Sequence, residues 1–280
     1  MKKLSQQKFT GERALFRASS LEIENSVFED GESPLKESRD ITVSGSIFKW
    51  KYPLWYSTGA VVRDSTLLVT ARSGIWYTKG ISVIDCTVDA PKTFRSCEGV
   101  AVRSSTFPHA EETLWRCSDV SISDSSFSGD YLGLSATRVK ADNISISGNY
   151  AFDGGRDIEI SSSRLISKDA FWNCENVTVR DSVIIGEYLG WNSKNLKFIN
   201  CTIESNQGLC YIDGLVLENC RLINTDLAFE RCSGVDATVL GDIISIKNPI
   251  SGVIRARSIG EVILDESDPE LVTVITEGED

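Results

Sequence analysis

Several residue types and patterns are scarce in this chain of 280 residues. It has one methionine and one histidine, His109. A single histidine excludes a multi-histidine metal site, and any Ser-His or Cys-His dyad would have to use His109. Positive charge is also in deficit, because 29 Lys and Arg stand against 40 Asp and Glu, for a net charge of −11. A general nucleic-acid binder needs a basic surface, so we expect no nucleic-acid partner, and the sequence signals neither a metal nor a cofactor.

Long apolar runs and paired cysteine motifs are missing as well. No stretch reaches 18 apolar residues, and the opening Met-Lys-Lys leads into polar residues. We therefore expect neither a membrane span nor a signal peptide, and a cytoplasmic location. There are eight cysteines but no Cys-x-x-Cys. In the cytoplasm such cysteines stay reduced, and neither a zinc knuckle nor a redox pair is indicated.

The sequence does contain a repeat of 19 to 21 residues. Its unit reads apolar–x–apolar–x–(Asn, Asp, Gly or Ser)–(Ser or Cys)–x–apolar, as in LEIENSVF (21–28) and LKFINCTI (196–203). One step of 38 residues equals two turns of 19, so one copy is hidden within residues 144–152, where the pattern is disturbed. The Ser/Cys column falls at positions 26, 46, 65, 86, 105, 125, 163, 182, 201 and 220.

This repeat predicts an all-β solenoid. Alternation with period 2 indicates strands, and strands that recur every 19 to 21 residues must pair with their own copies one turn away. We expect a single-stranded right-handed parallel β-helix of roughly 11 to 13 coils. A leucine-rich repeat lacks room for its helix here, and a left-handed hexapeptide helix needs a period of 18. The predicted layout is a cap or first half-coil over 1–20, the β-helix over 21–265 and an acidic tail over 266–280.

Most cysteines follow the repeat. They share its small-residue columns with serine, threonine and alanine, so we interpret them as buried small residues rather than catalytic thiols. One column after the first strand contains Cys86, Cys201 and Cys220, and a matching column after the second strand contains Cys97, Cys117, Cys174 and Cys232.

The second strand of each repeat is the candidate functional strip. Its inward column is Leu35, Leu54, Ile75, Phe94, Leu114 and Phe171. Alternation then turns outward Lys36, Trp55, Trp76, Arg95, Trp115, Trp172 and Trp191. A second outward set precedes the inward column by three positions, and it comprises Glu32, Lys51, Arg72, Glu111, Asp130, Lys168 and Glu187.

Tryptophans beside charges indicate a glycan or anionic-ligand groove. Flat indole faces can receive sugar rings, and the basic cluster can hold a uronate or a phosphate. The expected ligand-binding residues are the seven of the outward tryptophan column. If a reaction occurs, the candidate catalytic residues are Lys51, Arg72, Tyr77, Glu112 and Asp130. Two alternatives stay open: the tryptophans form an inward ladder in the core, or an outward surface that is structural or a protein interface, such as that of a homodimer.

Strings such as FTGERALF, DGESPLKESR, FKWKYPLWYS, ARSGIWYT, SKDAFWNCEN and GEYLGWNS resemble a family of small bacterial proteins classed as a domain of unknown function. This resemblance covers nearly the whole chain and implies no activity. The coil pattern also resembles the wider pectin-lyase-like superfamily, which implies carbohydrate chemistry by fold analogy. That superfamily's hydrolases carry paired aspartates, Gly-His-Gly and Arg-Ile-Lys, and its lyases cluster aspartates for Ca²⁺. None of these patterns is present, so no residue role is carried over.

Our leading hypothesis is a cytoplasmic carbohydrate-binding or carbohydrate-active protein that uses the strip. If it is an enzyme, the expected reaction is that of a lyase or hydrolase on a sugar, a uronate or a sugar phosphate. The alternative is a non-catalytic scaffold or homo-oligomerising module. These hypotheses are distinguished by the exposure of Trp55, Trp76, Trp115 and Trp172. An open groove with convergent acids and bases favours an enzyme, whereas a flat apolar patch favours an interface.

Overall fold

The computed structural model describes residues 2–277 and shows an all-β, right-handed parallel β-solenoid of about 14 turns. The predicted fold class is confirmed, and the turns slightly outnumber the roughly 11 to 13 expected from the repeat. Among the described residues the helical content is one short 3-10 turn, η1 (Val69–Ala71). No helix in this range is long and apolar enough to cross a membrane. The chain separates into two compact units, residues 1–145 and 146–280.

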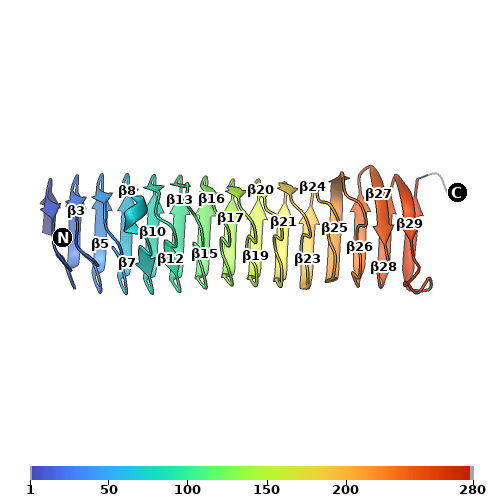
Figure 1. Ribbon diagram of the computed structural model, residues 1–280, viewed down its shortest axis with the longest axis horizontal. Coiled ribbons are helices and arrows are strands. Elements are labelled where there is room, and N and C mark those ends of the chain that lie inside the picture. Colours follow the sequence, from blue (N-terminus) through green and yellow to red (C-terminus); the bar gives the residue numbers. More distant parts are fainter. Residues whose placement is uncertain (1, 278–280) are drawn as a thin grey trace. The chain divides into compact units, whose positions relative to one another are not determined.

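In the first unit, each long strand pairs in parallel with its copy one turn away, in register (Figure 1). The long strands are β1 (Lys2–Ser5), β3 (Ser19–Glu24), β5 (Arg39–Ser44), β7 (Thr58–Arg63), β10 (Lys79–Ile84), β13 (Glu98–Arg103), β15 (Ser118–Ser123) and β17 (Thr137–Asp142). The short strands after them are β2 (Lys8–Phe9), β4 (Val27–Phe28), β6 (Ile47–Phe48), β8 (Thr66–Leu67), β11 (Thr87–Val88), β14 (Thr106–Phe107) and β16 (Ser126–Ser128). A third side of the turn contains β9 (Ile75–Trp76) and β12 (Phe94–Arg95), which pair with each other.

The second unit repeats this arrangement, and β18 (Ser145–Ser147) contains the boundary between the units. Its long strands are β19 (Arg156–Ser161), β21 (Glu175–Arg180), β23 (Ser193–Ile199), β25 (Ile212–Ile223), β26 (Val235–Val239), β28 (Gly252–Ala256) and β30 (Val272–Thr276). The remaining strands are β20 (Arg164–Ile166), β22 (Val183–Ile185), β24 (Thr202–Glu204), β27 (Asp242–Lys247) and β29 (Ser258–Ile263).

The core of each turn comes from the inward positions of these strands. Long strands show the alternation expected from the sequence, with Leu21 and Ile23 of β3 buried between half-exposed neighbours. Identical positions stack from turn to turn, as Phe28 and Phe48 do with ring centroids 4.4 Å apart and 3° between planes. Parallel in-register pairing therefore places like residues on like residues, which is why the pattern is readable in the sequence. All eight cysteines are buried and free, as the repeat predicts for the seven in its small-residue columns.

The Ser/Cys column has a hydrogen-bonding role beyond its small size. The Ser46 hydroxyl accepts a hydrogen bond from the backbone N–H of Ser26 at 3.0 Å and donates one to the carbonyl of Ser44 at 2.8 Å. Ser65 repeats both contacts for Ser46 and Arg63. A buried N–H that faces this corner thus finds an acceptor on the next turn, which satisfies backbone groups that the strands leave unpaired.

Polar ladders run along the exposed corners. In the second unit, the side-chain amide of Asn176 donates to Asp157 at 2.9 Å, and that of Asn195 donates to Asn176 at 3.0 Å. All three residues have positive φ, near 55° to 59°, which Asn and Asp adopt more easily than other non-glycine residues. Positive φ recurs at several points of every turn. The chain therefore turns sharply at several corners of each coil.

Strands are also present near both ends of the chain and at the hidden copy of the repeat. Strand β1 pairs with β3, and β30, which lies in the predicted acidic tail, pairs with β28. The last three residues of that tail lie outside the described range. The hidden copy keeps its register, because β17 pairs with β15 and Ile144 takes the Ser/Cys position. Replacement of the usual small polar residue by isoleucine is what obscured it in the sequence.

Candidate functional site

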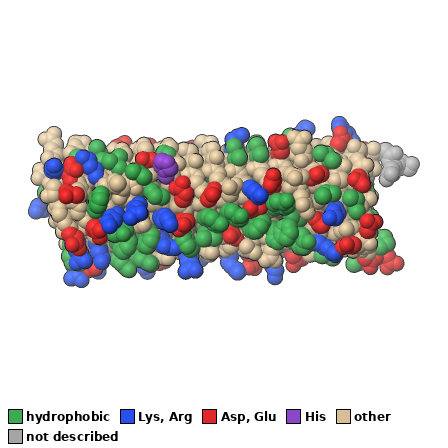
Figure 2. Space-filling view, viewed as in Figure 1, with side chains coloured by type: hydrophobic (Ala, Val, Ile, Leu, Met, Phe, Trp, Pro, Cys, Tyr) green, Lys and Arg blue, Asp and Glu red, His purple; other side chains and the backbone are tan. Residues whose placement is uncertain are grey.

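The first unit carries a cluster of aromatic and cationic side chains on the side of the coil that precedes the long strands. We call it the first aromatic cluster, and it comprises Lys36, Trp50, Lys51, Tyr52, Trp55, Tyr56, Arg72, Trp76, Tyr77, Arg95 and Trp115. Its tryptophans on the predicted column, Trp55, Trp76 and Trp115, are half-buried, neither in the core nor fully exposed. In Figure 2, hydrophobic side chains gather over the turns of β7 to β12 and Lys and Arg side chains border them.

The indole rings of this cluster stack on one another along the coil axis. Trp55 and Trp76 lie 5.1 Å apart at 8°, and Tyr52 packs against Trp55 at 4.4 Å. Their N–H groups are used as well, since Trp55 donates to the carbonyl of Ser73 at 2.6 Å and Trp76 to that of Lys92 at 2.9 Å. Ring edges face outward while the flat faces are covered. The expectation that a sugar stacks on these indole faces therefore does not fit Trp55 and Trp76.

Arg95 occupies the tryptophan column between two indoles. Its guanidinium carbon lies 4.8 Å from the ring centroid of Trp76 and 3.8 Å from that of Trp115. The register explains this contact, because Arg95 pairs with Trp76 on one side and with Trp115 on the other. No described carboxylate lies within ion-pair distance of Arg95. Its planar faces are thus held by rings, and its N–H edge stays available to an anion.

Three of the predicted catalytic residues, Lys51, Tyr77 and Glu112, are engaged in ion pairs or ring stacking. Lys51 makes an ion pair with Glu32 at 2.6 Å, and this contact raises the pKa of Lys51, so that it stays protonated rather than acting as a base. Glu112 is paired with Lys92 at 2.9 Å. Tyr77 stacks on Tyr56 at 4.9 Å. Arg72 is exposed beside Lys51.

Asp130 is exposed two turns away from Arg95, on the rung after Glu112. The structure therefore brings together Lys36, Lys51, Arg72, Arg95 and the first three tryptophans of the column, but it brings no acid–base pair to them. The prediction that these residues bind a ligand has not been tested and stays a prediction.

Sequence reasoning missed three aromatic residues of this cluster, Trp50, Tyr52 and Tyr56, and it gave Tyr77 a catalytic role only. Trp50, Tyr56 and Tyr77 expose 40%, 48% and 41% of their surface. Lys36 lies over the Tyr56 ring at 5.6 Å. The available signal was an aromatic residue directly after two successive tryptophans of the column, in Trp55-Tyr56 and Trp76-Tyr77. Tyr56 also lines a pocket of about 440 Å³ with Arg17, Ser19, Glu37, Arg39 and Thr58.

The second unit has its own aromatic cluster, made of Tyr150, Trp172, Tyr188, Trp191 and Tyr211. Trp191 stacks on Tyr211 at 4.2 Å, whereas Tyr150 and Trp172 meet edge-on at 89°. The one predicted cation here, Lys168, is neutralised by Glu187 at 3.3 Å. Trp172 and Trp191 are thus half-buried packing residues with a cation already paired beside them.

Asp169, next to Lys168, is the unusual acid of this second cluster. It is 2% exposed, and its Oδ1 has no hydrogen-bond partner among the described residues. Burial raises the pKa of Asp169, against the opposing effects of Lys168 and of a hydrogen bond from Tyr150. Nothing in the sequence pattern singles out this residue.

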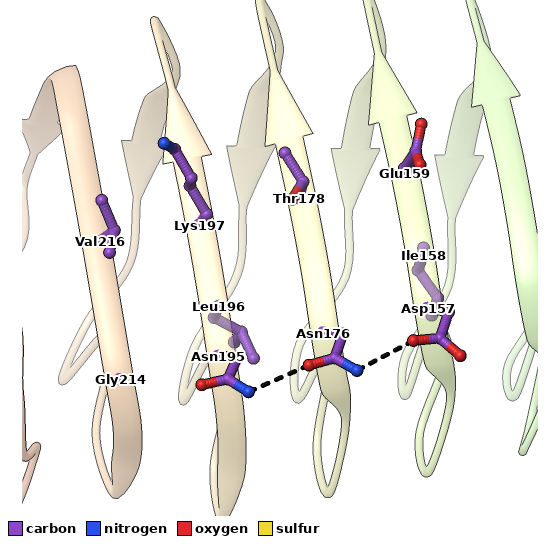
Figure 3. Close-up of a pocket in the computed structure, with 10 residues that line it drawn as sticks. All are labelled: Asp157, Ile158, Glu159, Asn176, Thr178, Asn195, Leu196, Lys197, Gly214 and Val216. Carbon is purple, nitrogen blue, oxygen red and sulfur yellow. Dashed lines mark hydrogen bonds between the residues drawn. The ribbon is translucent and has the colours of Figure 1, made fainter.

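The long-strand face of the second unit has a separate, open groove of about 510 Å³ (Figure 3). The Asp157–Asn176–Asn195 ladder lies along one side, and Glu159, Thr178 and Lys197 stand on the other. Lys197 is paired with Glu218, and Asp157 already accepts the Asn176 amide. The groove offers hydrogen bonds to a polar molecule but no unpaired charge on these two residues.

Metal binding has little support within residues 2–277. No group of three or more His, Cys, Asp or Glu side chains there could hold a metal ion. His109 is exposed and contacts Asp89 at 2.7 Å, and that carboxylate raises the pKa of the imidazole. We place it on the surface, away from the first aromatic cluster.

Comparisons with known proteins agree on the fold. The surface adhesin PfbA of Streptococcus pneumoniae is 12% identical, with a TM-score of 0.50, over 84% of this chain and 85% of that one. A tailspike protein of E. coli bacteriophage HK620 in complex with a pentasaccharide is 12% identical, with a TM-score of 0.43, over 91% of this chain and 62% of that one. The likeness to the adhesin shows a β-helix fold alone, and a search of curated proteins finds no match. Residues 2–275 match a family model described as "Protein of unknown function (DUF3737)", and the chain belongs to that family.

Proposed function

We propose that this protein binds an anionic saccharide at the first aromatic cluster and does not transform it. The observation that carries the proposal is Arg95, held between Trp76 and Trp115 with no carboxylate partner among the described residues. Ring stacking fixes the guanidinium plane, so that a ligand carboxylate or phosphate meets two N–H groups already oriented for it.

The charge distribution supports an anionic ligand. The whole chain has a net charge of −11, and most described lysines and arginines pair with acids. Lys36, Arg72 and Arg95 lie in one cluster without such a pair. Cations without acidic partners repel one another, and a bound anion offsets this electrostatic repulsion.

The arrangement favours binding over catalysis. Catalysis on a glycosidic bond needs a pair of groups in complementary protonation states on either side of it. Lys51 and Glu112 are both held in ion pairs with Glu32 and Lys92. A binding module needs only the cations and the aromatic edges.

The test is a calorimetric titration with trigalacturonic acid, and with maltotriose as the uncharged counterpart. We expect trigalacturonic acid to bind at least tenfold more tightly. Arg95→Gln should weaken that binding about tenfold, which corresponds to one charge-assisted bidentate contact. Arg103→Gln removes an exposed arginine at the end of β13 and should change the affinity less than twofold.

Two outcomes oppose the proposal. Equal affinity for the charged and neutral trisaccharides, or an Arg95→Gln variant that binds like the parent protein, would overturn it. The exposed rings of Trp50, Tyr56 and Tyr77 keep a second candidate, a homo-oligomer interface. A concentration-dependent dimer by light scattering that dissociates on Tyr56→Lys, without any saccharide binding, would favour that candidate.

A further inference from the structure

A stack of rings presents a flat face only at its end. Within the first aromatic cluster, Tyr77 covers one face of Tyr56, with centroids 4.9 Å apart and 17° between planes. On the preceding turn the equivalent position is Glu37, whose backbone N–H bonds to the carbonyl of Trp55. Glu37 is not stacked on Tyr56, because its carboxylate pairs with Arg17 at 2.8 Å. Tyr56 is therefore the last ring of the tyrosine column, and it is 48% exposed.

The pocket of about 440 Å³ lies at this end of the column. Tyr56 shares its lining with two arginines, one carboxylate and two hydroxyl side chains: Arg17, Arg39, Glu37, Ser19 and Thr58. Its size is within the range of small-molecule sites. It thus combines the unstacked face of Tyr56, which Lys36 borders, with donors and an acceptor at the scale of one sugar ring.

Charge in this pocket is unbalanced. Arg17 and Glu37 neutralise each other. Arg39, at the start of β5, is exposed and pairs with no described carboxylate. The ammonium group of Lys36 lies 5.6 Å from the centroid of the Tyr56 ring, so a second cation borders the same ring.

We propose that this pocket binds one pyranose ring that carries an anionic substituent. The ring packs on Tyr56, the anionic group pairs with Arg39, and sugar hydroxyls bond to Glu37 and Thr58. The inference deepens the proposed function and rests on it, because the pocket adjoins the cluster that contains Arg95. It also moves the stacking platform from Trp55 and Trp76, whose faces are covered, to a tyrosine.

The anionic substituent has two chemical sources, a carboxylate at C6 or a phosphate ester. Arginine binds both bidentately. We therefore use three monosaccharide probes that share the pyranose ring: methyl glucuronoside, glucose 6-phosphate and methyl glucoside. Saturation-transfer NMR identifies which ring protons contact the protein, and titration gives the affinity.

We expect the two anionic probes to bind and methyl glucoside to bind at least tenfold more weakly. Arg39→Gln should weaken the anionic probes about tenfold and leave methyl glucoside unchanged. Tyr56→Leu should weaken all three probes and reduce saturation transfer to the ring protons. Arg63→Gln, an exposed arginine at the end of β7 outside the pocket, is the matched control and should bind like the parent protein.

The outcomes separate this inference from the proposed function. If Arg39→Gln and Tyr56→Leu bind all probes and trigalacturonic acid like the parent protein while Arg95→Gln does not, the pocket is wrong and the proposed function stands. If methyl glucoside binds as tightly as the charged probes, the anionic requirement is wrong. If no probe and no trisaccharide binds to folded protein, both proposals fail. Circular dichroism of each variant establishes that its solenoid is intact.

Discussion

Individual side chains take different roles at equivalent positions of successive turns. Position 95 has an arginine where the turns before and after it have Trp76 and Trp115, and that exchange creates the cation held between two rings. In the second unit, Asp169 follows Tyr150 by one turn and precedes Tyr188 by one turn. There the exchange buries a carboxylate that lacks a partner for Oδ1. Such a difference changes local contacts directly, because each residue of a solenoid packs against the residues at the same position on the two neighbouring turns.

Asp169→Asn should stabilise the protein at neutral pH by about 1 kcal/mol, because a buried unpaired carboxylate oxygen is costly and asparagine tolerates positive φ. The pKa of Asp169 is raised in the fold, so its penalty is absent below the ordinary value of 3.8 and grows as the pH rises through the raised value. The gain measured by urea unfolding should therefore be largest near pH 7 and vanish towards pH 3. Asp265→Asn, at an exposed position, is the control. A gain that is the same at both pH values would contradict this account.

The strands of this fold are held in place by rows of equivalent residues that contact one another from turn to turn. Strand pairing supplies the backbone hydrogen bonds, and the Ser/Cys column accepts hydrogen bonds from buried backbone N–H groups at one corner. At an exposed corner, asparagine side chains form a hydrogen-bonded ladder that begins at an aspartate. The asparagine amide is suited to this role since it donates to one neighbour and accepts from the other. Aspartate begins such a ladder because it can only accept.

Asn176→Asp tests this directionality. The new carboxylate still accepts from Asn195 but cannot donate to Asp157, and two carboxylates then face each other. We expect a loss of about 1–2 kcal/mol in unfolding free energy at pH 7. Asn206→Asp, at an exposed position whose side chain joins no ladder in the described structure, should cost little. Urea unfolding of both variants measures the difference.

The net charge of the whole molecule should affect the proposed ligand differently at long range and at short range. A net charge of −11 repels anions, while the cations of the first aromatic cluster attract them locally. The proposed binding of an anionic oligosaccharide therefore depends on a small region of opposite sign. Both aromatic clusters are described within their own unit, and only the first contains unpaired cations.

Salt should weaken the binding of trigalacturonic acid several-fold between about 20 and 200 mM NaCl, because screening acts on close ion pairs at the surface. Arg95→Gln should bind weakly with a shallower salt dependence. Titration calorimetry at four salt concentrations measures both slopes. An affinity independent of salt would mean that aromatic and hydroxyl contacts alone bind the saccharide, contrary to the role given to Arg95.

The repeat by itself determined the parallel solenoid, the inward column that includes Leu35 and Phe94, and the burial of the cysteines. These are properties of one turn repeated in register, so each residue's position follows from its place in the period. Family membership was also visible in the sequence strings.

Only the tertiary structure decided what the outward residues do. Sequence alternation placed Trp55 and Trp76 outward but could not show that their faces are covered by each other, because stacking depends on rotamers across turns. It also could not show that Lys51 and Glu112 are neutralised by Glu32 and Lys92. The pocket at Tyr56 and the surroundings of the buried Asp169 arise from residues of different turns, which meet only when the turns stack. In such a fold, the position of a residue in the repeat specifies whether its side chain points inward or outward. The residues on neighbouring turns specify whether that side chain is stacked, paired or free to bind.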